Sequence, residues 1–540
     1  MSGLSQHLPI LPVLLPAFTA IVLLLIGDQG SLSERSHTHR RLRWGRRIAL
    51  ASATLGLLLA ALLVADAAVA DAPRVYRVGE WPAPYGIAIV IDRLGALMLL
   101  LTSLVALPVL WYASGGWDAR GRHFHALFQF QLMGLAGAFV TGDLFNLFVF
   151  FEVLLIASYV LLVHGQGRER FRVGLHYVVL NLAASSLFLI GVALLYAKTG
   201  TLNLADLAVR VPMIPAPDAA VLQAAALLLL VVFGFKAALM PLAMWLPATY
   251  AASSAPVAAL FAIMTKVGVY AIIRVHGVVF GDGAGASALA AQEWLLPLAL
   301  ATSAMGVVGA LAAHTLPRLV AWLTVSSVGT VLAGIGLYST EGWTAALFYM
   351  VNSTLGIAGL FLLSELVGAQ RGDAADRLVP ASPVAQPMLL GLLLLLGAAS
   401  TSGLPPLPGF IGKLMILQAA SAHGWGIAVW TVVLGVGFLT LIGLARAGSI
   451  LFWNVQRGGP STAAVLSGAS VPLLGATIAL LGAGVLMSAM AAPIQRYMHD
   501  TALQLADRDA YARAVLPESG GAAADTALPY RGLPPPAGTK

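Results

Sequence analysis

The sequence has 540 residues, of which 59% are hydrophobic and only 10% are charged. This composition excludes an ordinary soluble globular protein of this length. The formal net charge is +7, which we attribute to the distribution of basic residues across a membrane rather than to a nucleic-acid surface. The chain has no cysteine, which excludes disulfides and cysteine-ligated iron–sulfur clusters on it.

Apolar runs of about 20 residues follow one another almost from end to end, and each is long enough to cross the hydrocarbon core of a bilayer. Segments of alternating polarity, which a transmembrane β-barrel requires, do not occur. The predicted fold class is therefore an all-α polytopic membrane protein with about 14 transmembrane helices. The expected spans begin near His7, Ile48, Gly86, Ala126, Leu144, Val173, Ala219, Pro256, Glu293, Pro317, Trp343, Pro387, Trp425 and Val465.

Basic residues concentrate in alternate loops of this arrangement, which predicts the orientation. Cytoplasmic loops hold more Lys and Arg than the loops facing the other way. The loops expected on one side carry Arg35, Arg40, Arg41, Arg43, Arg46, Arg47, Arg120, Arg122, Arg168, Arg170, Arg172, Arg318, Arg371, Arg377 and Arg457. Those on the other side carry only Arg74, Arg77, Lys198, Arg210 and Arg274. Both termini are therefore expected outside the cytoplasm.

The two ends of the chain differ in character. The N-terminus lacks a basic region and a small-residue cleavage site, so residues 8–26 are expected to be a retained first helix rather than a signal peptide. After Pro493 acidic residues alternate with Ala, Gly and Pro. For residues 493–540 we expect a short amphipathic piece followed by a disordered polar tail.

Two of the expected spans, one in each half of the chain, contain helix-breaking residues beside a lysine. Lys236 precedes Pro241 and Pro247, and a Gly/Pro-rich run over 403–409 precedes Lys413. Proline removes a backbone donor and clashes with the preceding turn, so both helices are expected to be discontinuous. Paired interrupted helices are typical of inverted-repeat transporters with a polar cavity near the midplane. A simple proline kink is the alternative.

Four charged residues within the expected spans are the candidate site: Glu152, Lys236, Lys266 and Lys413. A lysine at mid-bilayer costs roughly 2.5–3.5 kcal/mol, and such residues usually line ion or proton paths or pair with an opposite charge. Glu152 is the acid that can pair with Lys236, and a lysine that approaches and leaves a carboxylate can take up and release a proton. A static buried ion pair is the alternative.

The other two lysines differ in their surroundings. Lys266 has no acid nearby in the sequence and apolar residues on both sides, which favours a proton relay over snorkelling to the headgroups. Lys413 follows the second break, where it could end a relay or, alternatively, complement carbonyls freed by the break. Asn181 and Asn352 are weaker candidates for holding water, because a lone polar residue in a bundle is more often a helix contact. Asp92 lies near an expected helix end, where anchoring explains it equally well.

Motifs for other chemistry do not stand out. The sequence shows no phosphate-cradling glycine-rich loop, zinc-ligand spacing or nucleophile–base constellation. We therefore expect no cofactor, no metal site and no enzyme activity, and expect transport to be driven by ion gradients or a partner rather than by ATP.

Three long segments carry a resemblance to a known family: residues 142–165 (GDLFNLFVFFEVLLIASYVLLVHG), residues 233–274 (beginning FGFKAALM) and residues 402–417 (SGLPPLPGFIGKLMIL). They resemble the antiporter-like membrane subunits shared by respiratory complex I and the multisubunit Mrp/Mnh/Pha cation/proton antiporters, the D-subunit family most of all. The resemblance extends from the first span to about Leu486.

This resemblance implies fourteen helices with two inverted five-helix repeats, each with one discontinuous helix. The implied division is three N-terminal helices over 1–123, a first repeat over 124–280, a second repeat over 281–455, a last helix over 456–492 and the tail over 493–540.

The resemblance also implies roles for the four charged residues. Glu152 matches the family's acid on the fifth helix, Lys236 its lysine on the broken seventh, Lys266 that on the eighth and Lys413 that on the broken twelfth. Three positions depart from the wider pattern, because histidines common there are replaced by Ala243, Tyr250 and Asn352. This leaves more of the implied path to bound water.

The function implied is that of a proton-translocating component of a multisubunit Na⁺ or K⁺/H⁺ antiporter in the bacterial inner membrane, with the A, B, C, E, F and G subunits as partners. Two alternatives remain. One is a proton-pumping membrane component of a complex I-like oxidoreductase or membrane-bound hydrogenase, although the tail is too short and Pro/Gly-rich for a long lateral helix. The other is a non-transporting assembly scaffold.

Overall fold

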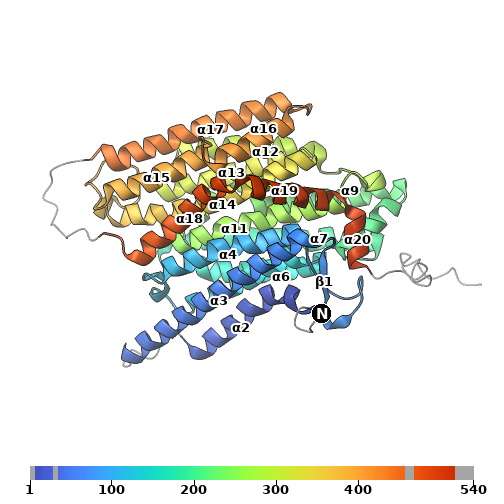
Figure 1. Ribbon diagram of the computed structural model, residues 1–540, viewed down its shortest axis with the longest axis horizontal. Coiled ribbons are helices and arrows are strands. Elements are labelled where there is room, and N and C mark those ends of the chain that lie inside the picture. Colours follow the sequence, from blue (N-terminus) through green and yellow to red (C-terminus); the bar gives the residue numbers. More distant parts are fainter. Residues whose placement is uncertain (1–5, 28–34, 456–467, 517–540) are drawn as a thin grey trace, which may run out of the picture.

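The computed structural model describes residues 6–27, 35–455 and 468–516. Long helices run side by side through the molecule, most of them along its longest axis (Figure 1). The helices of the first half are α2 (Leu11–Ile26), α3 (Arg35–Val69), α4 (Arg93–Ala113), α5 (Phe124–Val140), α6 (Leu144–Val163), α7 (Arg168–Thr199), α8 (Leu204–Arg210), α9 (Ala216–Ala237), α10 (Trp245–Ala252) and α11 (Ala255–Ile272). Those of the second half are α12 (Gln292–Leu311), α13 (Leu316–Ile335), α14 (Thr340–Ala369), α15 (Pro387–Ser402), α16 (Pro408–Ala420), α17 (Gly426–Gly448), α18 (Val471–Ala489), α19 (Ala491–Ala506) and α20 (Arg508–Val515).

Among the described residues, twelve segments are helical, long and apolar enough to cross a membrane. The predicted polytopic helical membrane protein is therefore confirmed. The two remaining expected spans coincide with shorter helices, namely the 17-residue α5 and α15, which has 16 residues and is followed by the 13-residue α16.

A β-hairpin that the all-helical expectation missed lies between α3 and α4. Strand β1 (Arg74–Arg77) pairs antiparallel with β2 (Ala88–Ile91), with Arg74 opposite Ile91. The third span therefore begins at Arg93 and not near Gly86. The aliphatic residues of β2 are buried, and Asp92 then starts α4 by accepting a hydrogen bond from the Gly95 backbone N–H at 2.8 Å.

The hairpin marks one of the two ends of the helix bundle. We call this end, where β1, β2 and the first residues of α4 lie, the hairpin face. The opposite end, where α4 and α14 finish and α7 begins, is the arginine face, with Arg46, Arg120, Arg170 and Arg371 near it. The first arginine-rich segment is not a loop, because α3 is helical from Arg35. In Figure 1 the hairpin face lies on the right, with β1 and α20.

Both predicted helix interruptions are present. The first separates α9 from α10 and contains Pro241. The second separates α15 from α16, over residues 403–407. The two interrupted segments run in opposite directions, since α9 starts near the hairpin face and α15 near the arginine face (Figure 1).

The half-helices before the two breaks end in the same way. In α9 the Leu239 N–H donates to the Gly234 carbonyl at 2.7 Å, and in α15 the Leu404 N–H donates to the Ala399 carbonyl at 2.8 Å. Both bonds span five residues, as in a Schellman motif. The residue directly before the donor has a positive φ in each case: 63° at Ala238 and 89° at Gly403. Glycine suits this conformation, whereas alanine at 238 is strained in it.

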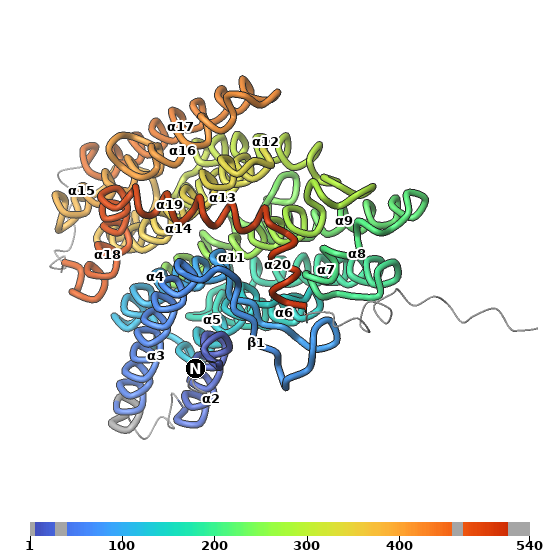
Figure 2. Tube along the Cα trace, turned by 45° about the vertical axis from the view of Figure 1, so that its right-hand side comes forward, coloured from blue at the N-terminus to red at the C-terminus, as the bar shows by residue number. Residues whose placement is uncertain are grey.

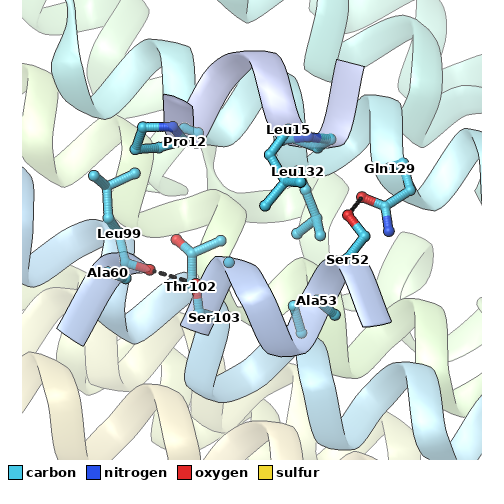
Figure 3. A pocket seen from close by; sticks show the side chains of 14 residues that line it. Pro12, Leu15, Ser52, Ala53, Ala60, Leu99, Thr102, Ser103, Gln129 and Leu132 are labelled. Carbon is cyan, nitrogen blue, oxygen red and sulfur yellow. Dashed lines mark hydrogen bonds between the residues drawn. The ribbon is translucent and has the colours of Figure 1, made fainter. Parts of the chain in front are cut away.

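The N-terminal helices enclose a cavity of about 40 Å³ between α2, α3, α4 and α5 (Figure 3). The Ser52 hydroxyl on its wall accepts a hydrogen bond from Thr19 at 2.9 Å and donates to Gln129 Oε1 at 3.5 Å. Such a volume holds about one water molecule or a few. None of the four candidate site residues lines this cavity, so we assign it to packing.

The chain remains helical beyond the last expected span. Helix α19 packs along α4 and α14, and α20 turns onto α8 and β1 (Figure 2). The amphipathic piece expected after Pro493 is thus part of α19, and it is followed by a second packed helix that we did not expect. The disorder expected toward the C-terminus concerns residues 517–540, which lie outside the described residues.

Because both breaks need a left-handed residue, exchanging glycine and alanine at positions 403 and 238 should affect stability differently. Replacement Gly403→Ala should destabilise the protein by roughly 1–2 kcal/mol, because it places a Cβ in the left-handed region and within 2.9 Å of the Lys413 side chain. Replacement Ala238→Gly is the control and should cause no such loss. Thermal denaturation of the detergent-purified protein measures both, and equal losses would contradict the argument.

Candidate functional site

Lys236 lies in the last turn of α9, directly before the first break, and is 8% exposed. Its Nζ donates a hydrogen bond to Asn181 Oδ1 on α7 at 3.1 Å. The same nitrogen lies 5.7 Å from the centre of the Phe151 ring, a distance at which a cation is attracted by the aromatic face. The ammonium is therefore held by a neutral amide and a ring.

Glu152 lies on α6 and accepts a hydrogen bond from the Ser185 hydroxyl of α7. The direct contact expected between Glu152 and Lys236 is wrong for this conformation, because no ion pair joins them although both are described. They remain close enough for their charges to interact. Asn181 and Ser185 are four residues apart and therefore neighbours on one face of α7. This face of α7 gives the lysine and the acid a neutral partner each.

Lys266 is completely buried in the middle of α11. Its Nζ donates to the hydroxyl of the adjacent Thr265 at 3.2 Å, and within residues 35–455 it forms no ion pair. Helix α11 packs directly against the end of α9, since a Cβ added at Gly268 would lie 2.5 Å from the Ala237 nitrogen. The glycine allows this close approach, which brings the Lys266 helix against the first break.

Lys413 lies on α16, just after the second break, and is 7% exposed. Its Nζ donates to the carbonyls of Thr401 and Ser402 at 3.0 and 2.9 Å. These carbonyls belong to the last turn of α15, so the lysine complements the backbone groups that the break frees. This is the alternative role considered for it, and it leaves the ammonium 6.0 Å from the Tyr349 ring.

Polar side chains also lie near Lys413 and in the interior of the second half. The Tyr349 ring lies 6.0 Å from Lys413 Nζ, and Thr330 and Ser303 share a hydrogen bond of 2.9 Å. Asn352 accepts a bond from Ser400 at 2.9 Å, so it ties α14 to the helix before the break. Three of these residues, Ser303, Thr330 and Tyr349, were not singled out from the sequence. Hydroxyl residues in an apolar run were the available signal, and it does not distinguish them from helix contacts.

The two other departures from the family pattern lie near the first break. Ala243 is buried in the short turn between α9 and α10. Tyr250 is buried on α10 and donates to the Phe261 carbonyl at 2.8 Å. Its hydroxyl is therefore engaged with the backbone of α11.

A cavity of about 720 Å³ opens at the arginine face near the start of α11. It is lined by Tyr250 of α10, Ser254 at the start of α11, Ala258 of α11 and Glu365 of α14. The Ser254 hydroxyl is buried without a hydrogen-bond partner among the described residues, so water entering the cavity would satisfy it. Lys266 lies eight residues beyond Ala258, or about 12 Å along the helix.

The arginine face is also fixed by a buried acid. Asp118 forms an ion pair with Arg46 at 2.6 Å and a hydrogen bond with His125 at 2.9 Å. Burial by itself would raise the pKa of Asp118, but the bonds from Arg46 and His125 outweigh it and hold that pKa below its ordinary value. The carboxylate therefore stays charged and ties α3 to α5.

At the other end of α11 the structure corrects the assignment of Arg274 to a loop. Arg274 lies in the first turn of the π-helical extension η6 (Ile273–Val279) and is buried. Its Nη2 pairs with Asp92 Oδ1 at 2.6 Å, and its Nε donates to the Tyr270 hydroxyl at 2.9 Å. Lys266, Tyr270 and Arg274 follow one another at four-residue intervals, which places them along one side of the helix.

Comparison with known proteins shows relatives that match most of the chain. Residues 141–440 match the family model described as NADH:quinone oxidoreductase/Mrp antiporter, TM. The chain is 41% identical to the probable K(+)/H(+) antiporter D subunit of Rhizobium meliloti, over 93% of this chain and 96% of that protein. It is 34% identical to the Na(+)/H(+) antiporter D subunit of Alkalihalophilus pseudofirmus, over 95% and 100%. A chain of the Mrp complex from Dietzia sp. DQ12-45-1b superposes with a TM-score of 0.82 at 28% identity, covering 95% of this chain and 100% of that one.

The neutral partner of Lys236 yields a prediction about charge at the first break. Replacement Asn181→Asp places a carboxylate where the amide oxygen lies 3.1 Å from Nζ, and at an effective dielectric near 20 an ion pair at about 4 Å is worth roughly 4 kcal/mol. Lys236 should then be trapped in its charged form, with cation-dependent proton movement reduced at least tenfold. Fluorescence of a pH dye in vesicles measures this. The near-isosteric Asn181→Leu removes the partner without adding charge, and similar behaviour of both variants would contradict trapping.

Proposed function

The chain belongs to the NADH:quinone oxidoreductase/Mrp antiporter family of transmembrane proteins, and we propose that it moves protons through the membrane interior as the D subunit of a multisubunit monovalent cation/proton antiporter. Its relatives in R. meliloti and A. pseudofirmus are named as such D subunits and match nearly its whole length. The proposed relay consists of Glu152, Lys236, Lys266 and Lys413.

One observation carries the proposal: three lysines are buried in the helix bundle, two of them beside the two helix breaks and the third on the helix packed against the first break. Their partners are an amide, a hydroxyl and two carbonyls. A buried ammonium without a carboxylate in contact can lose its proton at little cost, because burial disfavours the charged form. Each lysine is therefore able to accept a proton and pass it on.

The first break supplies the switching element of this mechanism. Lys236 and Glu152 interact electrostatically but form no ion pair, and each bonds a neutral side chain of α7, Asn181 and Ser185 respectively. When Lys236 swings toward Glu152 the ion pair stabilises its charged form and it takes up a proton. When it returns to Asn181 that support weakens, and the proton moves toward Lys266 through water. Water is required because the side-chain contacts of the described residues do not join the four relay groups in one unbroken chain of hydrogen bonds.

We infer fourteen membrane crossings arranged as two inverted repeats of five. The first repeat would contain α5, α6, α7, the broken α9–α10 and α11, and the second α12, α13, α14, the broken α15–α16 and α17. Two features support it: the broken span is the fourth of each set, and both breaks follow the same five-residue capping bond. The residue ranges would be 1–123, 124–280, 281–455, 456–492 and 493–540.

The arginine face is proposed to lie in the cytoplasm of a bacterial cell, with both termini on the other side of the inner membrane, because cytoplasmic segments are rich in arginine. The partners are proposed to be the A, B, C, E, F and G subunits of an Mrp-type complex. The coupled ion is Na⁺ or K⁺, since the two compared relatives carry one name each.

Removal of the first charged pair tests the relay. Variants Glu152→Ala and Lys236→Ala should each abolish cation-dependent proton movement in inverted vesicles while the complex still assembles. Lys198→Ala is the matched control, since this lysine lies at the surface, one-third exposed and paired with Asp218, and it should leave transport unchanged. Normal transport by either relay variant would refute the relay, and failure to assemble would favour the scaffold.

Comparison of ions and electron donors tests the alternative of a redox-driven pump, which the shared family description keeps open. We expect the purified complex, reconstituted in liposomes without an electron donor, to exchange protons for Na⁺ or K⁺ down an imposed cation gradient. The ion that gives the larger dye response is the coupled one. Proton movement only when a donor and a quinone are supplied would overturn the antiporter assignment.

A further inference from the structure

The buried pair of Arg274 and Asp92 at the hairpin-face end of α11 has no part in the relay. Their side chains are 4% and 2% exposed, and the Nη2–Oδ1 distance is 2.6 Å. Burying two charges costs desolvation that their attraction does not fully offset, so such a pair is weak evidence for a stabilising role. Its position relative to Lys266 points to another role.

The pair closes the hairpin-face end of the side of α11 that carries Lys266. Tyr270 lies one turn beyond Lys266, donates its hydroxyl hydrogen to the Phe139 carbonyl at 2.9 Å and accepts from Arg274 Nε at 2.9 Å. The donor is thus directed at a backbone carbonyl, which does not pass protons on, and the guanidinium is always protonated. This part of the helix holds fixed hydrogen bonds and a buried ion pair rather than groups that exchange protons.

A cavity open to solvent at the hairpin face is separated from the pair by one side chain, that of Tyr511. A cavity of about 310 Å³ at the hairpin face is lined by Arg93, Asp500, Asp507 and Tyr511, among others. The Tyr511 ring lies 5.8 Å from the Arg274 guanidinium carbon. Tyr511 belongs to α20 and is therefore the lid between the open cavity and the pair.

The C-terminal helices hold this lid in place. Asp507 starts α20 by accepting a bond from the Ala510 N–H at 2.9 Å, and α20 packs on α8 and β1 (Figure 2). The Tyr511 side chain is buried, and its ring lies over the Arg274 guanidinium. The ring therefore separates the pair from the open cavity.

The two ends of α11 differ in access although they are equally distant from the lysine. Ala258, on the wall of the 720 Å³ cavity, lies eight residues before Lys266, and Arg274 lies eight residues after it. Each separation is about 12 Å along a helix. Toward the arginine face an open cavity therefore reaches to within about 12 Å of Lys266 along the helix, whereas toward the hairpin face the ion pair and Tyr511 lie between the lysine and the cavity.

We propose that the Arg274–Asp92 pair, backed by Tyr270 and covered by Tyr511, is an electrostatic seal that stops protons and cations from passing between Lys266 and the hairpin face. An ion passing here would have to separate this buried ion pair, which is costly, and the guanidinium does not release its own proton. With this end sealed, protons that reach Lys266 continue toward Lys413 instead of escaping. The inference rests on the proposed relay and makes Arg274 and Asp92 positioning residues that keep transport coupled.

The decisive variant neutralises both charges but retains hydrogen-bonding side chains: Asp92→Asn combined with Arg274→Gln. The complex is reconstituted in liposomes containing a pH dye, and an acid pulse is applied in choline medium free of Na⁺ and K⁺. We expect the parent complex to hold the pH gradient and the double variant to dissipate it at least tenfold faster. Antiport is not measured in this medium, so a leak is detected whether or not the proposed exchange exists.

A second variant tests the lid without touching the pair. Tyr511→Ala should also increase the leak, whereas Tyr85→Ala, which removes a tyrosine that is 78% exposed in the segment between β1 and β2, should not. Because the chain contains no cysteine, Thr265→Cys provides a unique reporter beside Lys266. A small charged thiol reagent added at the hairpin face should label it only in the Tyr511→Ala or double-variant background.

An assembled double variant that holds the gradient like the parent, with the reporter unlabelled, would overturn the seal and leave the pair as a static tie between α4 and α11. Should the double variant fail to assemble, Tyr511→Ala decides the matter in the same way. A Tyr511→Ala complex that holds the pH gradient like the parent overturns the seal. One that dissipates the gradient faster and has a labelled reporter supports it.

Discussion

The need to hold ammonium groups inside an apolar helix bundle is the constraint on which the rest of the structure depends. Carboxylates in direct contact would satisfy these charges most firmly, but they would also keep the lysines charged. The bundle instead offers an amide to Lys236, a hydroxyl to Lys266 and backbone carbonyls to Lys413. Neutral acceptors satisfy hydrogen bonds while leaving both protonation states accessible, which is the property a proton relay requires.

The helix breaks follow from the same constraint. A continuous helix uses its carbonyls internally, so none is free to meet a lysine in mid-membrane. By ending α15 and starting α16 a few residues later, the chain frees the carbonyls that bind Lys413. At the first break the free group is used differently, since the Phe235 carbonyl accepts a bond from Trp245 of α10 at 3.1 Å and braces the two half-helices. The breaks therefore share a capping bond but not a set of contacts.

Much of this could be read from the sequence, because the signals were local. The apolar runs, the proline-rich interruptions and the buried lysines require no knowledge of neighbouring helices. The partners of the lysines could not be read, because Asn181 and Ser185 lie 55 and 33 residues from Lys236 and Glu152. The strand Ala88–Ile91 was missed because its aliphatic residues merge with the following apolar helix. Arg274 was placed in a loop because charge near a span end usually indicates solvent, and its partner Asp92 lies 182 residues away.

The C-terminal helices acquire a role from this long-range pairing. A segment rich in acidic residues after the last span would ordinarily be peripheral, yet α20 places Tyr511 over the guanidinium of Arg274. A lateral relay works only if protons leave it at its ends. The hairpin-face end of α11 is where protons on Lys266 would have the shortest way out to the hairpin face. An open cavity at the arginine-face end of α11 and a charged, covered closure at its hairpin-face end give the relay a direction without any moving gate at that position. Movement can then be confined to the first break, where Lys236 and Glu152 are near each other but not in contact.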